Sequence, residues 1–291
     1  MKNNIKRSNI NYNFLKKIIV RVDYNGILER ELEKTVGQLK DILKGKNFIR
    51  FEESYINQVD FEIKDPEQIE TQRMIPIQEI NKTKSYVFSN ENNLVQVIVS
   101  KYYTSITVDY GKYIKFEEIC VLFKEIYNII KNNNNYMRIL RLGLRKINNC
   151  ILLDLDRLND IIEVQYFSNL NSLFDDCKSL PILNKQNIDT FIYRETNVNL
   201  IRFLSSGVLE RNGKEQDAYQ LVFDIDSYRN EEEFFEINIK SSDDMYEQLL
   251  KLNNILFKTY ISILNEKFVE MLVNGNIDKD LLMGVEKNYE V

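Results

Sequence analysis

The stretch that decides the fold is Arg138-Ile139-Leu140-Arg141-Leu142-Gly143-Leu144-Arg145-Lys146-Ile147-Asn148. In an extended chain, successive side chains point to opposite faces of a sheet. The leucines at 140, 142 and 144 would then share one face, and Arg141, Gly143 and Arg145 would share the other. The stretch therefore predicts a strand or hairpin with one apolar and one charged face, and Asn148-Asn149 offers a turn.

The charged side of this stretch is a candidate binding site. Gly143 has no side chain, so an extended chain would leave a gap between the guanidinium groups of Arg141 and Arg145. Arginine binds carboxylate or phosphate through two parallel hydrogen bonds. The site made of Arg141, Gly143, Arg145 and Asn148 could therefore take a phosphate, an RNA backbone or an acidic segment of a partner.

A second alternating strand is predicted from Tyr219 to Asp226. Its apolar residues point to one face, and Asp224 and Asp226 point to the other. Two carboxylates on one strand face can hold Mg²⁺ or Mn²⁺, which makes them a candidate metal site. The competing interpretation is an ion-pair ladder with Arg141 and Arg145, or a solvated sheet face.

Strand-type and helix-type patterns continue on both sides of these two strands. Strands are expected at Ile18–Val22, Phe48–Ile63, Tyr86–Phe88, Leu94–Val99, Thr104–Tyr110, Ile161–Phe167, Phe191–Arg194 and Leu200–Glu210, with a turn at Asn212-Gly213. Helices are expected at Leu28–Leu43, with Gly45 as the C-terminal cap, at Phe116–Ile130, and at Asp243–Val273 behind the capping residues Ser241 and Ser242. Lys64–Lys84 and Asn169–Asp189 are expected to be irregular connections.

The order of these elements predicts an α+β fold in which antiparallel sheets pack with helices. Residues 1–14 are polar and are expected to form a disordered lead. Residues 15–165 and 166–291 are expected to form two α+β modules, and we consider the hypothesis that both are βββα units. The apolar stripe of the long C-terminal helix should lie across a sheet.

Four stretches together resemble a known family. They are Tyr86 to Ser89, Tyr113 with Phe116, the motif R-x-G-L-R-x-x-N from Arg141 to Asn148, and L-V-F-D-I-D from Leu221 with the apolar run from Leu252 to Leu264. Across most of the chain they resemble a sporadically distributed, functionally uncharacterised prokaryotic family. The resemblance supports the fold and leaves the activity open, and the patchy distribution of the family implies a defence-associated or mobile-element setting.

The composition narrows the classes of function. The chain has no histidine, and its three cysteines, Cys120, Cys150 and Cys177, have no metal-binding spacing, so we expect buried thiols in a reducing compartment. No phosphate-binding glycine loop occurs, and the sequence implies no cofactor. With 39 basic and 44 acidic residues, the net charge of −5 does not favour binding to nucleic acid.

The sequence therefore favours a non-catalytic interaction, adaptor or regulatory protein over an enzyme. Its partner would be another protein or a second copy of the chain, in the setting of a defence or toxin-immunity system. The alternative is an RNA- or nucleotide-handling protein that uses the arginine-bearing strand, with or without a metal. Without a long apolar stretch, the chain is expected in the cytoplasm and away from membranes.

Overall fold

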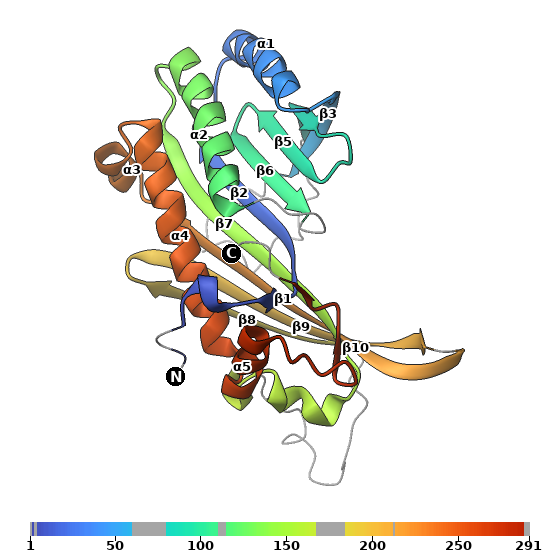
Figure 1. Ribbon diagram of the computed structural model, residues 1–291. Coiled ribbons are helices and arrows are strands. Elements are labelled where there is room, and N and C mark those ends of the chain that lie inside the picture. Colours follow the sequence, from blue (N-terminus) through green and yellow to red (C-terminus); the bar gives the residue numbers. More distant parts are fainter. Residues whose placement is uncertain are drawn as a thin grey trace, which may run out of the picture.

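The structure is a computed structural model that describes residues 2, 5–59, 80–109, 115–166, 184–211 and 213–287. Its centre is one large antiparallel sheet with the strand order β3-β4-β5-β6-β2-β7-β10-β9-β8 (Figure 1). The α+β class predicted from the sequence is confirmed.

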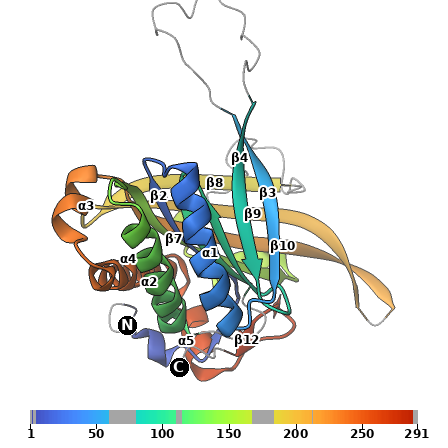
Figure 2. The same ribbon diagram turned by 90° about the horizontal axis from the view of Figure 1, so that it is seen from above.

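The strands are long, as the low glycine and proline content suggests. They are β2 (Leu15–Tyr24), β3 (Arg50–Val59), β4 (Ile80–Ser89), β5 (Val95–Ser100), β6 (Tyr103–Asp109), β7 (Ile139–Leu152), β8 (Asn184–Tyr193), β9 (Thr196–Arg211) and β10 (Lys214–Arg229). A short β11 (Leu282–Met283) pairs with the end of β7, and β1 (Tyr12–Asn13) pairs with β12 (Glu286–Lys287). The far end of the β9–β10 hairpin extends away from the rest of the sheet (Figures 1 and 2).

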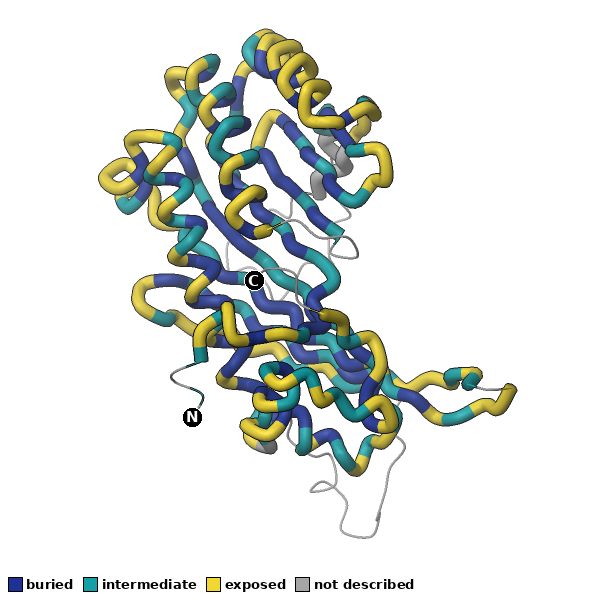
Figure 3. The backbone as a smooth tube through the Cα atoms, viewed as in Figure 1, coloured by how far each residue is buried: buried dark blue, intermediate teal, exposed yellow. Residues whose placement is uncertain are grey.

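Three helices cover one face of the sheet: α1 (Glu29–Gly45), α2 (Phe116–Asn133) and α4 (Ser242–Ile263) (Figure 2). Each buries one stripe of apolar side chains, such as Leu32, Val36 and Leu39 of α1. The chain also forms α3 (Glu232–Asn238), α5 (Glu266–Asn274) and short 3-10 helices at Arg7–Asn9, Leu155–Asp160 and Val164–Tyr166. Buried residues are concentrated along the central strands of the sheet (Figure 3).

The sheet runs across the boundary expected between the two modules. β7 from the first half pairs with β10 from the second over the eleven residues from Leu142 to Leu152. The elements follow the order β4-β5-β6-α2 before β7 and β8-β9-β10-α3-α4 after it, and all of these strands belong to one sheet. A duplication of one unit remains a hypothesis.

The long C-terminal helix is interrupted, which corrects the expectation of one helix from Asp243 to Val273. It begins as expected, since the Ser241 side chain accepts a hydrogen bond from the backbone N–H of Asp244. It ends at Ile263 because Leu264 is extended and forms an isolated bridge with Ile162. Asn265 then caps α5 by accepting a hydrogen bond from the N–H of Lys267.

Several smaller expectations also need correction. Asn148 and Asn149 lie inside the continuous strand β7 and form no turn, because both pair with β10. The strand expected at Ile161–Phe167 is a turn followed by a 3-10 helix over its described part. Gly45 is still helical, and the left-handed residue that follows α1 is Asn47, with φ of 65°. The connections expected at Lys64–Lys84 and Asn169–Asp189 are wrong in their described parts, because residues from Ile80 belong to β4 and residues from Asn184 belong to β8. The rest of both segments lies outside the described residues.

Residues 5–14 pack against the body of the protein, where the sequence predicted a disordered lead. Phe14 is fully buried, and its ring lies 5.7 Å from that of Tyr260, 5.8 Å from that of Phe223 and 6.1 Å from that of Phe268. The composition of the segment is polar, but this one aromatic residue anchors its end between the sheet, α4 and α5.

The described cysteines behave as small apolar residues. Cys120 and Cys150 are buried and free, and burial raises the pKa of each thiol to about 12. Cys177 lies outside the described residues. Across the part of the chain that the structure describes, no helix is both long and apolar enough to span a membrane.

We predict that Phe14→Ala lowers the free energy of unfolding by about 3–5 kcal/mol, because it empties a buried aromatic position. Urea unfolding followed by circular dichroism measures this loss. Tyr136→Ala, at a side chain that is 91% exposed, is the control and should change stability by about 0.5 kcal/mol or less. A loss below about 1 kcal/mol for Phe14→Ala would show that the lead does not contribute to the core.

Candidate partner-binding face

The alternation predicted for β7 places its two kinds of side chain on opposite faces of the sheet. Leu142 and Leu144 are completely buried on the face that the helices cover. Arg141 and Arg145 point the other way, and their side chains are 27% and 44% exposed. We call the second face, around these two arginines, the ionic face.

Strand register determines the neighbours of these arginines. Arg145 lies opposite Ile19 of β2 and Asp226 of β10, and Arg141 lies opposite Asp23 of β2. Directly paired residues in an antiparallel sheet share a face, so charged residues of three adjacent strands come together. They are Arg21 and Asp23 of β2, Arg141 and Arg145 of β7, and Asp224 and Asp226 of β10.

Arg145 and Asp224 form a two-pronged ion pair. The Nε atom of Arg145 donates to Oδ1 of Asp224 at 2.7 Å, and its Nη2 atom donates to Oδ2. This is the geometry in which a guanidinium group binds a carboxylate most strongly. The hydrogen bond that Arg145 donates to Asp224 accordingly raises the pKa of Arg145.

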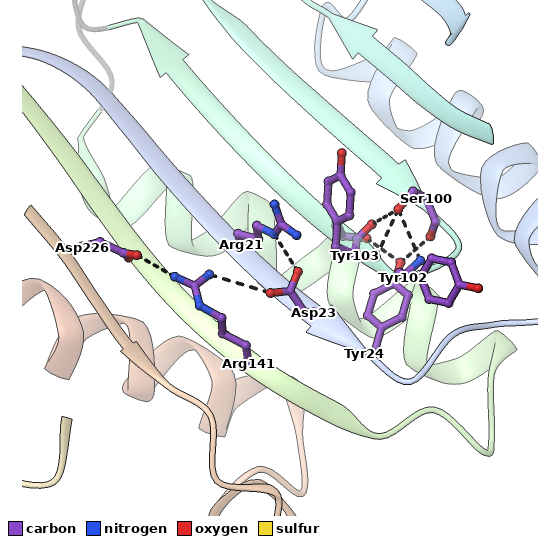
Figure 4. Close-up of polar contacts among 9 residues, drawn as sticks. Arg21, Asp23, Tyr24, Ser100, Tyr102, Tyr103, Arg141 and Asp226 are labelled. Carbon is purple, nitrogen blue, oxygen red and sulfur yellow. Dashed lines mark hydrogen bonds and ion pairs between the residues drawn. The ribbon is translucent and has the colours of Figure 1, made fainter. Parts of the chain in front are cut away.

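Arg141 links β10 to β2 (Figure 4). Its Nη2 atom donates to Oδ2 of Asp226 at 2.6 Å, and its Nη1 atom lies 3.8 Å from Oδ2 of Asp23. Asp23 in turn accepts a hydrogen bond from Nε of Arg21 at 2.6 Å. Positive and negative groups therefore alternate across the three strands.

Two tyrosines hold the arginines in place from the side. The guanidinium carbon of Arg21 lies 4.1 Å from the ring centre of Tyr103, and that of Arg141 lies 4.6 Å from the ring centre of Tyr228. Such contacts attract a cation to the ring face. They also fix two long side chains that would otherwise lose conformational entropy on binding a partner.

The gap expected above Gly143 is filled by the protein itself. A Cβ atom built on Gly143 would lie 2.9 Å from Nη1 of Arg141, so the guanidinium group occupies the space that the glycine leaves. The expectation of an open gap between the two arginines is therefore wrong. Gly143 serves to let Arg141 fold across the strand toward Asp226.

Asn148 does not belong to this cluster. It pairs with Phe223 on the helix-covered face, and it is 5% exposed. The sequence motif therefore joins residues from two different faces of the sheet.

The two aspartates of the proposed metal site are each held by an arginine, as the ion-pair interpretation had it. Desolvation by burial raises the pKa of Asp226, and the charges of Arg141 and Arg145 act in the opposite direction. Among the described residues, no group of three or more histidine, cysteine, aspartate or glutamate side chains could hold a metal ion. The metal site at Asp224 and Asp226 thus gains no third ligand from the described chain.

The ionic face continues to an apolar edge at β8. Ile188 and Ile192 lie opposite Ile201 and Asn197 of β9 on this same face, and they are 60% and 73% exposed. Within the described residues β8 pairs with β9 alone, so its outer backbone groups can pair with an added strand.

Sequence reasoning singled out the residues of β7 and β10 but missed Arg21, Asp23, Tyr103 and Tyr228. A signal was present for the first two, since they occupy alternate positions in Arg21-Val22-Asp23 beside a buried valine. The tyrosines carry no such local signal, because their role depends on strand register.

Comparison with known proteins does not identify the chain. No family model matches it, and no curated protein matches it. Among solved structures, it is similar to the Pct1 RNA triphosphatase of S. pombe in complex with the Spt5 CTD, with 7% identity over 90% of this chain and 84% of that one. The TM-score of 0.12 is too low to support an inference.

We predict that Arg141→Gln raises the pKa of Asp226 further, because it removes an attractive charge and a hydrogen bond. Arg145→Gln, which removes a charge but no hydrogen bond to Asp226, should raise it less. Carboxyl-carbon NMR titration measures both shifts. An unchanged or lowered pKa in Arg141→Gln would contradict the observed pairing.

The direction of this shift also fixes a pH dependence of stability. A carboxyl group whose pKa is raised in the folded state holds more protons there than in the unfolded state. Its contribution to the free energy of unfolding therefore falls as pH rises from the ordinary aspartate pKa to the raised one. In Arg141→Gln the pH range over which the free energy of unfolding falls should extend to higher pH, because the folded-state pKa of Asp226 is higher.

Proposed function

We propose that this chain is a non-catalytic binding protein that holds a partner protein on the ionic face and along the edge of β8. In this role it acts as an adaptor or regulator. The observation that carries the proposal is the surface itself. A balanced row of three arginines and three aspartates runs toward exposed isoleucines on β8, which pairs with β9 alone among the described residues.

The chemistry of this surface suits a protein partner. Arginine and tyrosine are enriched at protein interfaces, and they supply much of the binding energy at the residues that matter most. Here the Arg21–Tyr103 and Arg141–Tyr228 contacts exist before any partner binds. Such preorganised side chains lose little entropy on association.

The balance of charge argues against a polyanion as the partner. Arg141 and Arg145 are each neutralised by an aspartate, so a phosphate would have to displace a carboxylate from its hydrogen bonds. Nucleic-acid affinity depends on unneutralised cations that replace the counterions of the phosphates. A partner protein whose own surface carries alternating charges does not need unneutralised cations on this face in order to bind.

The β8 edge indicates how a partner segment could be held. An extended segment can add to an exposed edge strand through backbone hydrogen bonds, with side-chain contacts on alternate residues providing specificity. Ile188, Thr190 and Ile192 point to the ionic face at those alternate positions. A partner strand with apolar residues at the matching positions would extend the sheet. The family resemblance suggests a component of a defence or toxin system as the source of such a partner.

The test is recovery of a partner at unit stoichiometry from the native host, compared between wild type and two variants. Arg141→Gln/Asp226→Asn removes an ion pair without leaving an unpaired charge, and Ile188→Lys/Ile192→Lys places charges on the apolar edge. Both should remain folded and recover at least about tenfold less partner, a loss of about 1.4 kcal/mol or more. The Arg141–Asp226 pair is largely buried, and replacing both partners together leaves no uncompensated buried charge, so the double variant should keep its fold.

Leu28→Lys is the matched control, because Leu28 is 69% exposed beside α1 and away from the ionic face. It should recover the partner as wild type does. Undiminished recovery by both test variants would refute the proposed surface. A co-purifying nucleic acid that is lost in Arg141→Gln/Asp226→Asn would instead support the RNA-handling alternative.

A further inference from the structure

The outer edge of β8 carries little that would keep another strand away. Sheet edges in native proteins are usually protected by charged residues, prolines or bulges. Residues 186–193 of β8 contain no proline or glycine and a single charged residue, Asp189. The carboxylate of Asp189 lies 2.5 Å from Nη2 of the buried Arg202 of β9, so it is held by its own sheet. This edge is therefore suited to the addition of a strand.

The opposite edge of the sheet differs in this respect. The strand β3 begins with Arg50-Phe51-Glu52-Glu53, and three of these four residues are charged. Glu53 also forms an ion pair with Lys84 of β4. Charges of this kind disfavour the addition of a strand to an edge. Of the two ends of the sheet, β8 is therefore the one whose sequence favours a further strand.

The exposed side chains of β8 show what kind of strand would fit. Ile188 and Ile192 point to the ionic face and are 60% and 73% exposed, and the exposed Thr190 lies between them. All three are β-branched, and β-branched side chains stabilise a sheet through contacts with the residues directly opposite. The matching strand needs an apolar residue opposite each isoleucine.

The strand β8 itself meets this requirement in one register. In an antiparallel pair related by a two-fold axis perpendicular to the sheet, directly opposite residues lie on the same face. With the axis at Thr190, Ile188 of each copy lies opposite Ile192 of the other. An axis at Asp189 or Phe191 instead places each isoleucine opposite a polar or charged residue. No other position of the axis brings both isoleucines opposite isoleucine.

We propose that the edge of β8 binds β8 of a second copy of this chain, antiparallel and with the two-fold axis at Thr190. The inference rests on the account of the β8 edge in the proposed function and names the strand that adds there. Each copy covers the exposed edge of the other, so the assembly closes as a dimer. The two ionic faces then lie on the same side of one continuous sheet, and a further partner meets a surface made by both copies.

The first test is sedimentation velocity of the purified full chain at rising concentration. The chain should pass from monomer to dimer and no further, because pairing of the two β8 edges leaves neither of them free. A chain that stays monomeric at every concentration, or that assembles beyond a dimer, would overturn the inference.

Two double variants test the register. Ile188→Lys/Ile192→Lys places lysine opposite lysine at both pairs, and Ile188→Lys/Ile192→Glu places lysine opposite glutamate. Like charges directly opposite each other destabilise a sheet, and opposite charges stabilise it. The dissociation constant of the dimer should therefore be at least about tenfold lower for Ile188→Lys/Ile192→Glu than for Ile188→Lys/Ile192→Lys. Equal constants, or no dimer from either variant, would contradict the register. Leu28→Lys is the control and should dimerise as wild type does.

A cysteine on the proposed axis provides an independent test, because a residue on the axis lies opposite itself. Under mild oxidation, Thr190→Cys should form a disulfide between copies, since directly opposite Cα atoms are about 4.5–5.5 Å apart. Gln186→Cys, on the same face of the same strand, is the matched control, because the register places it opposite Arg194 of the second copy. Both variants carry Cys177→Ser, and the two other cysteines are buried. Equal cross-linking of the two variants, or none in Thr190→Cys, would refute the axis at Thr190.

The outcomes for the proposed function remain distinct. Arg141→Gln/Asp226→Asn, on β7 and β10, should leave the dimer unchanged while it lowers recovery of a host protein. A monomeric chain whose recovery of a host protein depends on Ile188 and Ile192 would overturn the inference and leave the proposed function, with a foreign strand at β8. A dimer that recovers no host protein would support the inference and count against the proposed function.

Discussion

The structure depends on the pairing of β7 with two strands at once. β7 binds β2 on one side and β10 on the other, and no other strand joins the two halves of the sheet within the described residues. Its strict alternation forces Leu142 and Leu144 under the helices and Arg141 and Arg145 onto the opposite face. A shift of one residue in register would exchange the two sets and bury both charges.

This constraint separates the chemistry of the two faces. On the ionic face, each arginine of β7 meets an aspartate of β10, and the surface is locally neutral although it is rich in charge. On the helix-covered face, Lys146 and Asn148 of the same strand end beside Asn253 and Tyr260 in a partly polar pocket. One strand thus contributes to a candidate surface for a protein on one face and to the helix-covered core on the other.

Much of the fold could be predicted from sequence, because alternation and helical periodicity are local signals. They placed the central parts of β5, β6, β9 and β10, and the cap at Ser241. The break at Leu264 was missed because a tertiary bridge to Ile162 causes it, while the apolar stripe continues through Phe268. Similarly, alternation along each strand predicts that Arg141 and Asp226 each lie on a charged strand face. Only the strand register shows that the two side chains form an ion pair. Asn253 has the local sequence of an ordinary helical residue. Its lack of a hydrogen-bond partner among the described residues depends on how the N-terminal segment, β2, β7 and β10 pack around α4.

Native-state hydrogen exchange in increasing denaturant tests the central claim most directly, that β7 unites the two halves into one cooperative sheet. Amides of β7 that bind β2 and β10 should open only with global unfolding, and the protected amides of β6 and β9 should merge with them into one transition. Two separate transitions, with the strands before β7 and those after residue 184 opening at different free energies, would contradict this account.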